Sequence, residues 1–207
     1  DNLTAIQHGA SAPEQENTNT RAYWNTIWSG EGADTWRQYP TCFQMISHII
    51  GTGKRVLDMG CGVGVLASRI RNAGNTVYGC DISDAAVRLM HSTHGIPGVA
   101  AEAPYIPFAS NSMDVAVATE FLEHFQHPET VLAELAHVAR LVIVSVPNNI
   151  LGPQDIHEHY QQFTPSSLQA LMRQCFTQIE LVEFVDGFDT SAGRISLPTL
   201  LAVGANL

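Results

Sequence analysis

The sequence predicts a single α/β domain in which a mostly parallel sheet is covered by helices on both faces. Apolar, strand-like runs alternate with segments of helical spacing from residue 55 onward. Strands separated by helices require right-handed crossovers and therefore lie parallel. The last two strands have no helix between them, so we expect them to form a hairpin that adds one antiparallel strand. A chain of 207 residues is long enough for one sizeable core.

The elements are justified in order along the chain. Residues 1–20 are polar and without periodicity, and we expect a flexible arm there. Residues 21–207 are then one domain, in which 21–52 form a helical, aromatic lid with an apolar helix over 41–50. Ser83 is placed to cap one helix, and Thr164 with Pro165 to begin another. The expected strands are 55–59, 75–80, 98–102, 114–119, 140–146, 178–185 and 194–204, and the other helices are 63–73, 84–93, 128–139 and 164–175.

A glycine-rich turn between the first strand and its helix is the most informative segment. Gly60 and Gly62 let the backbone bend tightly and approach a ligand, and the helix N-terminus that follows offers unpaired N–H groups. A dinucleotide fingerprint needs a third glycine where Val65 stands, and no P-loop Gly-Lys-Ser/Thr follows. Asp58, two residues before the turn, would repel a pyrophosphate but suits a ligand that carries an ammonium group.

Two further acids follow the next strands. Asp81 ends the second strand, where a carboxylate can accept hydrogen bonds from two ribose hydroxyls. Alone, an acid at a strand end is more often part of a helix cap, here beside Ser83, but together with Asp58 and the glycines it favours the ribose. Glu102 follows the third strand and precedes an apolar loop that contains Pro107 and Phe108. A plain loop is the alternative for that segment.

In this order, the Asp-x-Gly-x-Gly-x-Gly turn, the acid 23 residues later and the segment 99–114 resemble the class I S-adenosylmethionine-dependent methyltransferases. The resemblance covers residues 55–176. Within the family, the chain is similar to the methyltransferases of the ubiquinone and menaquinone pathways. It implies a Rossmann-like sheet of seven strands in the order 3-2-1-4-5-7-6, with the last strand antiparallel, and S-adenosylmethionine as cofactor. The cofactor-binding residues that we assign on this basis are Asp58, Gly60, Cys61, Gly62, Asp81, Ile82, Glu102, Ala103 and Glu120.

The catalytic candidates lie beyond the fourth and fifth strands, at the edge where open α/β sheets bind ligands. His124 and His159 are our catalytic candidates. The unperturbed pKa of histidine suits a general base at neutral pH, so His124 could remove a proton from the acceptor; alternatively, it only braces its loop. Glu120 and Glu123, with these histidines, match a divalent-metal set found in some methyltransferases that this sequence resembles, including small-RNA terminal methyltransferases. Glu123 could instead face solvent, and we expect no resident metal.

Composition narrows the acceptor to a small molecule. Ten Lys and Arg against twenty Asp and Glu give a formal net charge of −10, which disfavours nucleic acid as a partner. We expect Trp28, His124, Pro147, Asn148 and His159 to surround a small, uncharged or partly aromatic acceptor. The aromatic residues before the first strand either close over it as a lid or only fasten the arm.

We therefore expect an enzyme that transfers the methyl group of S-adenosylmethionine to an oxygen, nitrogen or carbon nucleophile of a small molecule. The alternatives are a non-catalytic S-adenosylmethionine-binding regulatory module, a metal-assisted methyltransferase acting on a diol or RNA end, and, with least support, a nicotinamide oxidoreductase. We expect a cytoplasmic protein. The spacing of the four cysteines favours reduced thiols, no apolar run is long enough to span a membrane, and the sequence shows no signal-peptide pattern.

Overall fold

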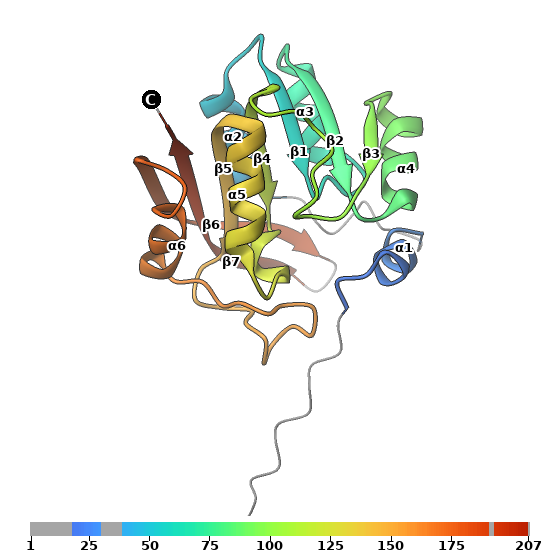
Figure 1. Ribbon diagram of the computed structural model, residues 1–207. Helices are drawn as coiled ribbons and strands as arrows, with labels where there is room; N and C mark the ends of the chain where they lie inside the picture. Colours follow the sequence, from blue (N-terminus) through green and yellow to red (C-terminus); the bar gives the residue numbers. More distant parts are fainter. Residues whose placement is uncertain (1–17, 30–38, 191–192, 207) are drawn as a thin grey trace, which may run out of the picture.

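The computed structural model describes residues 18–29, 39–190 and 193–206 (Figure 1). Helices and strands alternate around one sheet of seven strands in the order β3-β2-β1-β4-β5-β7-β6. The strands are β1 (Arg55–Met59), β2 (Thr76–Asp81), β3 (Gly98–Ala100), β4 (Met113–Thr119), β5 (Ala139–Pro147), β6 (Gln178–Thr190) and β7 (Gly193–Ala205). The helices are α1 (Arg21–Ser29), α2 (Pro40–Ile50), α3 (Val65–Asn72), α4 (Asp84–His94), the 3₁₀ turn η1 (Leu122–His124), α5 (Pro128–Val138) and α6 (Pro165–Met172).

The strand order and directions confirm the predicted fold. β1 pairs in parallel with β2 and β4, and the parallel set continues to β3 on one side and to β5 on the other. β7 runs antiparallel to both β5 and β6. A helix leads from β1 to β2, from β2 to β3 and from β4 to β5, and a loop leads from β3 to β4. β6 and β7 follow each other directly and form a hairpin.

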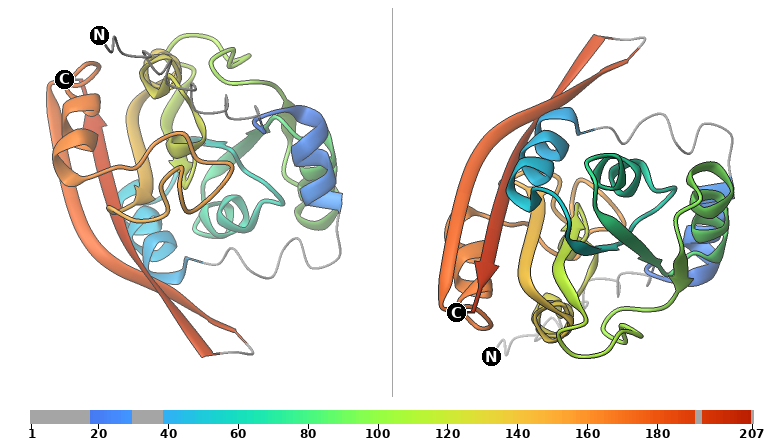
Figure 2. Two further views of the ribbon diagram at one scale, coloured as in Figure 1. Left: turned by 90° about the horizontal axis from the view of Figure 1, so that it is seen from below. Right: turned by 90° about the horizontal axis from the view of Figure 1, so that it is seen from above.

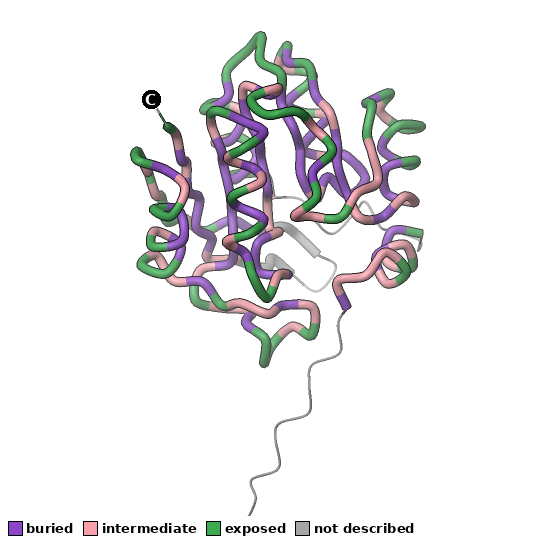
Figure 3. Tube along the Cα trace, viewed as in Figure 1, coloured by how far each residue is buried: buried purple, intermediate pink, exposed green. Residues whose placement is uncertain are grey.

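Two apolar layers hold the helices on opposite faces of the sheet (Figure 2). Along β4 the alternation is regular: Ala116 belongs to the layer that contains α5 and α6, and Val115 and Val117 to the layer that contains α2 and α3. The central strands are buried from both sides, as Figure 3 shows for β1, β4 and β5. Near-continuous apolar runs are what a parallel sheet covered on both faces requires.

Local signals set most helix ends. The Ser83 hydroxyl accepts from the Ala86 N–H and caps α4, as predicted. Thr164 caps α6 in a reciprocal pair with Ser167. The third helix begins at 65 rather than 63, because Gly64 has φ of 84° and stands as its N-cap outside the helical range.

Some predicted extents differ from the structure. The hairpin strands are longer than expected, reaching 190 and 193, because every residue of β6 finds a partner on β7. Of the predicted arm, residues 1–17 lie outside the described residues, and so do 30–38 of the predicted lid. Among the helices of the described residues, none combines the length and the apolar character that a membrane crossing requires.

Candidate active site

The glycine-rich turn lies at the carboxyl edge of the parallel strands, between β1 and α3. Its backbone N–H groups are already bonded: those of Gly60 and Cys61 donate to the Cys80 carbonyl at 2.8 and 3.1 Å, and that of Gly62 donates to Asp81 Oδ2 at 2.8 Å. These three N–H groups of the turn are therefore not available to a ligand; the expectation of unpaired N–H groups concerned the helix N-terminus that follows. Because these N–H groups already donate to the neighbouring strand, the turn is poorly suited to bind a phosphate.

Asp58 lies beneath this turn, at the end of β1, and is 1% exposed. Burial, and then the negative charge of Asp81, raise the pKa of its carboxyl to about 7, while a backbone hydrogen bond at Ala67 lowers it. Its Oδ2 atom is buried and has no hydrogen-bond partner among the described residues. A buried acceptor of this kind, on the wall of a cavity, suits a cationic donor from a ligand.

Asp81 holds two backbone segments together at the end of β2. Its Oδ2 accepts from the Gly62 N–H at 2.8 Å, and its Oδ1 accepts from the Ser83 N–H at 2.9 Å. The carboxylate thus fixes both the glycine turn and the start of α4.

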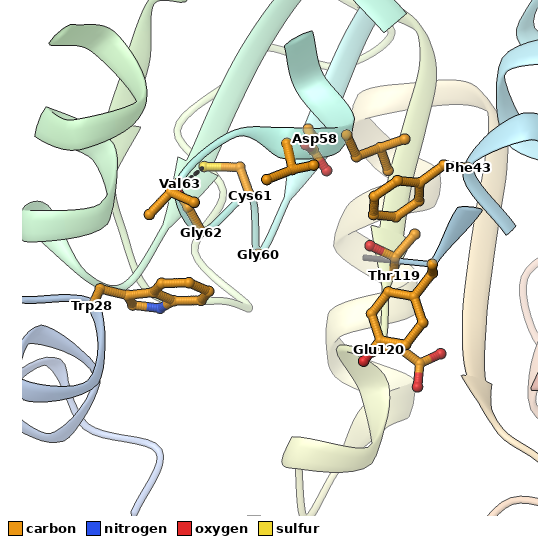
Figure 4. A pocket seen from close by; sticks show the side chains of 12 residues that line it. Trp28, Phe43, Asp58, Gly60, Cys61, Gly62, Val63, Thr119 and Glu120 are labelled. Carbon is orange, nitrogen blue, oxygen red and sulfur yellow. Dashed lines mark hydrogen bonds between the residues drawn. The ribbon is translucent and has the colours of Figure 1, made fainter. Parts of the chain in front are cut away.

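Four cavities lie along this edge. The middle cavity is lined by Asn19, Trp24, Trp28, Gly60, Asp81, Ile82, Glu120, Phe121 and His124. The turn cavity is lined by Asp58, Gly60, Gly62 and Glu120, with Trp28 on its wall; Figure 4 shows Trp28 and Glu120 on opposite sides of its opening. The edge cavity continues it past β3, and the histidine cavity, of about 260 Å³, opens beside it. The edge cavity is lined by Asn19, Met59, Ile82, Ala101, Glu102, Ala103, Phe121 and Phe125. The histidine cavity is lined by Tyr39, Glu120, Glu123, His124, Pro147, Leu151, Ile156, Glu158, His159 and Leu197.

Glu120 lies where the turn cavity and the histidine cavity adjoin, and it lines both. It has φ of 47°, a left-handed conformation that is uncommon for a residue with a side chain and that is found preferentially at functional sites. The Ser145 hydroxyl, at the end of β5, donates to Glu120 Oε1 at 3.0 Å. β4 and β5 together therefore fix this carboxylate at the junction.

The structure brings His124 and His159 together, with ring centroids 4.7 Å apart in an edge-to-face arrangement. His124 Nδ1 lies 3.1 Å from the Glu158 carbonyl, and His159 Nδ1 contacts the Leu151 carbonyl. A carbonyl can only accept, so both Nδ1 atoms donate, and each neutral ring carries its lone pair on Nε2.

Glu123 completes a cluster with the two histidines. One ligand-type atom from each of the three residues lies within 4.8 Å of the others, and all three are buried. The alternative that Glu123 faces solvent is therefore wrong, since it is 1% exposed. The 3₁₀ turn η1 explains this: it brings Glu123 and His124 to the same side as the 148–164 loop, whose Tyr160 N–H donates to the Glu123 carbonyl at 2.8 Å.

α1 lies beside α4 (Figure 1). Its Trp24 and Trp28 line the middle cavity. Trp28 lies so close to the turn that a Cβ on Gly62 would meet its ring at 2.8 Å. Trp24 packs edge-to-face on His124, with centroids 5.2 Å apart, and the Tyr23 hydroxyl donates to Glu158 Oε1. Of the two interpretations of this segment, these contacts favour the lid.

Two residues expected around the acceptor do not line the histidine cavity, although Trp28 shares the middle cavity with His124. Trp28 lines the turn cavity rather than the histidine cavity, and the Asn148 amide donates to Glu183 Oε2 on β6. Sequence reasoning also missed Glu158 and Phe121 as site residues. Glu158 had a signal, since it stands between His157 and His159, but its link to Tyr23 spans 135 residues and depends on the tertiary fold.

Comparisons with known proteins agree with this architecture. Residues 57–141 match the family model described as a methyltransferase domain. A ubiquinone biosynthesis O-methyltransferase from Bordetella parapertussis is 31% identical over 149 residues, which are 59% of this chain and 61% of that enzyme. The chain thus spans less than two thirds of that relative.

Solved structures share the fold at low sequence identity. The YcgJ protein of Bacillus subtilis has a TM-score of 0.66 at 14% identity, covering 80% of this chain and 98% of that one. A Thermotoga maritima S-adenosylmethionine-dependent methyltransferase, described as a possible histamine N-methyltransferase, has a TM-score of 0.64 at 16% identity, covering 90% and 94%. Over residues 57–141 the chain is thus similar to methyltransferase domains, and its fold is the one shared by these solved structures.

Proposed function

We propose that this protein transfers the methyl group of S-adenosylmethionine to an oxygen, nitrogen or carbon nucleophile of a small molecule. The observation that carries the proposal is the buried Asp58 Oδ2, which lines the turn cavity and has no hydrogen-bond partner among the described residues. S-adenosylmethionine has an ammonium group on its methionine end, and such a donor would satisfy this oxygen. The bonded N–H groups of the turn, by contrast, disfavour a dinucleotide.

The remaining cofactor contacts follow the edge of the sheet. Asp81 lines the middle cavity beside Ile82 and would accept hydrogen bonds from the ribose hydroxyls. Ile82, Glu102 and Ala103 line the edge cavity and would enclose the adenine ring. When bound, the cofactor supplies an electrophilic methyl group on a sulfonium sulfur.

Methyl transfer then depends on alignment across the junction at Glu120. The acceptor occupies the histidine cavity, next to the turn cavity, so that its nucleophile can lie in line with the methyl group. His124 lines the histidine cavity and the middle cavity, and its Nε2 lone pair can hold the proton that an oxygen or nitrogen acceptor loses.

The size and lining of the histidine cavity support a small acceptor. A cavity of about 260 Å³ lies near the lower end of the range typical of small-molecule sites. The net charge of −10 disfavours nucleic acid. The O-methyltransferase relatives support oxygen as the acceptor atom, and the four free thiols support a reducing, cytoplasmic location.

Calorimetry and a turnover assay test the proposal in two steps. S-adenosylhomocysteine should bind, and NAD should not; equal or tighter binding of NAD would refute the cofactor assignment. Release of S-adenosylhomocysteine is then followed over a panel of phenols, catechols, amines and carbon acids. Binding without turnover on any acceptor would support the non-catalytic binding module instead, and efficient methylation of RNA alone would contradict the small-molecule acceptor.

A second candidate is metal-assisted transfer, and the cluster of Glu123, His124 and His159 favours it. Two imidazoles whose Nδ1 atoms donate to carbonyls present Nε2 as a ligand atom, which is the usual arrangement of metal-bound histidine. One carboxylate and two imidazoles suit a divalent transition ion. Such an ion would hold and acidify a hydroxyl of the acceptor; Glu123, His124 and His159 would keep it beside the junction.

Elemental analysis of protein purified without chelator tests this candidate. Under metal-assisted transfer, and contrary to the expectation from the sequence, the protein should hold about one equivalent of divalent ion, which Glu123→Gln should lose with S-adenosylhomocysteine affinity unchanged. Glu129→Gln, which changes an exposed acid on α5, is the matched control. If the protein holds no stoichiometric metal and EDTA does not change its activity, this candidate is wrong and His124 alone accepts the proton.

A further inference from the structure

Helix α1 makes hydrogen bonds on both sides of the cleft. On the cofactor side, Asn25 Oδ1 accepts from the Ser83 hydroxyl at 2.7 Å and from the Ala85 N–H at 3.2 Å, and its amide donates to Asp84 Oδ1 at 2.9 Å. These bonds fasten α1 to the N-terminus of α4, directly after Asp81 and Ile82. Any movement of α1 therefore alters the wall of the cofactor site.

On the other side, α1 reaches the 148–164 loop through Tyr23. The Tyr23 hydroxyl donates to the Glu158 carboxylate. The backbone carbonyl of Glu158 accepts from His124 Nδ1 at 3.1 Å. Burial raises the pKa of the Glu158 carboxyl, but the Tyr23 hydrogen bond and nearby backbone and histidine groups lower it further than burial raises it. The carboxylate is thus ionised at neutral pH, and the bond to Tyr23 is charge-assisted.

His124 is held from a second direction by the same helix. The Trp24 ring meets it edge-to-face at 5.2 Å, and the Trp24 Nε1–H donates to Asn19 Oδ1 at 3.2 Å. His159 packs against His124 at 4.7 Å from the remaining side. The tautomer and ring orientation of His124 therefore depend on where α1 and the loop lie relative to each other.

We propose that Tyr23 is a positioning residue: by holding Glu158, it locks the carbonyl that orients His124, and so couples closure of α1 over the cofactor to alignment of the acceptor-side histidine. The proposal rests on the methyltransferase function proposed above but assigns a role to residues outside the cofactor and metal contacts. Tyr23 touches neither reactant in this scheme. Its loss should impair the chemical step while leaving the cofactor pocket intact.

Tyr23→Phe is the informative variant, because it removes only the hydroxyl and keeps the ring that packs at 5.5 Å on Trp24. Tyr105→Phe is the matched control, since Tyr105 is 78% exposed. Glu158→Gln keeps an oxygen that can accept from Tyr23, whereas Glu158→Ala does not. If the two residues act through one bond, Glu158→Ala and the double variant with Tyr23→Phe should behave alike.

The first readout needs no turnover. Long-range ¹H–¹⁵N spectra of the histidine side chains are recorded at pH 8 with saturating S-adenosylhomocysteine, and the His124 signal is identified by its absence in His124→Gln. We expect a single Nδ1–H tautomer in the wild-type protein, in Tyr105→Phe and in Glu158→Gln. Tyr23→Phe and Glu158→Ala should show a tautomer mixture and faster exchange of the Nδ1 proton.

The second readout is kinetic and uses an acceptor found in the panel. Tyr23→Phe should lower kcat about tenfold, the scale of one lost charge-assisted hydrogen bond, with S-adenosylhomocysteine affinity within twofold of wild type. An unchanged His124 tautomer in Tyr23→Phe would overturn the proposal, even if no acceptor is found. Loss of cofactor affinity matching the loss of kcat would overturn it too, because it would mean that Tyr23 only fastens α1.

Discussion

Replacing Asp58 by Asn should stabilise the ligand-free protein at pH 8 and at the same time weaken cofactor binding. The Asp58 carboxyl is buried at the end of β1, next to the charge of Asp81, and its pKa is raised to about 7. Above that pH the folded protein must keep a buried negative charge that the unfolded chain exposes to water. Asn has the same shape without the charge, so the variant removes this cost.

The size and the pH range follow from the pKa difference. An unfolded Asp has a pKa of ~3.9, so the difference of about 3 units corresponds to roughly 4 kcal/mol as an upper limit. Below pH 4 both states hold the proton and Asp58 costs nothing. Between about pH 4 and 7 only the folded state holds it, so the Asp58 contribution to the free energy of unfolding falls as pH rises. Above pH 7 the full cost remains.

Urea unfolding followed by circular dichroism at pH 4, 6 and 8 measures this difference. Asp58→Asn should match the wild type at pH 4 and exceed it by about 2–4 kcal/mol at pH 8. Asp114→Asn is the control with the opposite sign. Hydrogen bonds from Arg55 lower the pKa of Asp114, so any stability it contributes is present above its unfolded pKa and lost in acid. Equal pH dependence of the wild type and Asp58→Asn would refute the reasoning.

Cofactor binding should respond in the other direction. A ligand ammonium beside Asp58 favours the ionised carboxylate, so binding of S-adenosylhomocysteine at pH 7 should release about half a proton from this group. Calorimetry in buffers of different ionisation enthalpy measures the release. Asp58→Asn should abolish it and weaken binding by roughly 10- to 100-fold, the scale of a hydrogen bond to a charged group. Undiminished affinity in the variant would show that Asp58 does not hold the ammonium group.

Two further predictions separate local structure from ligand contact. Asp81→Ala should lower both the free energy of unfolding and the free energy of cofactor binding, each by about 1.5–3 kcal/mol. Ser83→Ala should lower the free energy of unfolding by about 1 kcal/mol and leave cofactor affinity unchanged. Urea unfolding and calorimetric titration measure the two quantities, and equal cofactor affinity of Asp81→Ala and the wild type would mean that Asp81 only stabilises the fold. Gly62→Ala should destabilise more than Gly53→Ala, since both have positive φ but only the former meets a neighbour, the Trp28 ring; thermal unfolding compares them, and equal losses would mean that α1 does not press on the turn.

The sequence by itself determined the elements, their order and the position of Asp58 and Asp81 beside the glycine turn. Strand β1, the Ser83 cap and the turn around Gly60 depend on residues a few positions apart, and the alternation of strands with helices leaves few topologies open. Asp58 and Asp81 end adjacent parallel strands, so their proximity follows from the order of the sheet. These are local or topological properties, which a pattern along the chain can carry.

Only the tertiary structure decided the acceptor half. The His124–Glu158 and Tyr23–Glu158 contacts join residues 34 and 135 positions apart through an irregular loop, and no periodicity specifies how such a loop folds back. The loop buries Glu123 beside His159, turning a residue that could have faced solvent into part of a cluster. Its packing also excluded Asn148, whose amide finds a nearer partner on β6. Loop conformation is set by long-range packing and hydrogen bonding, and that is why the chemistry of the acceptor site emerges only in the folded protein.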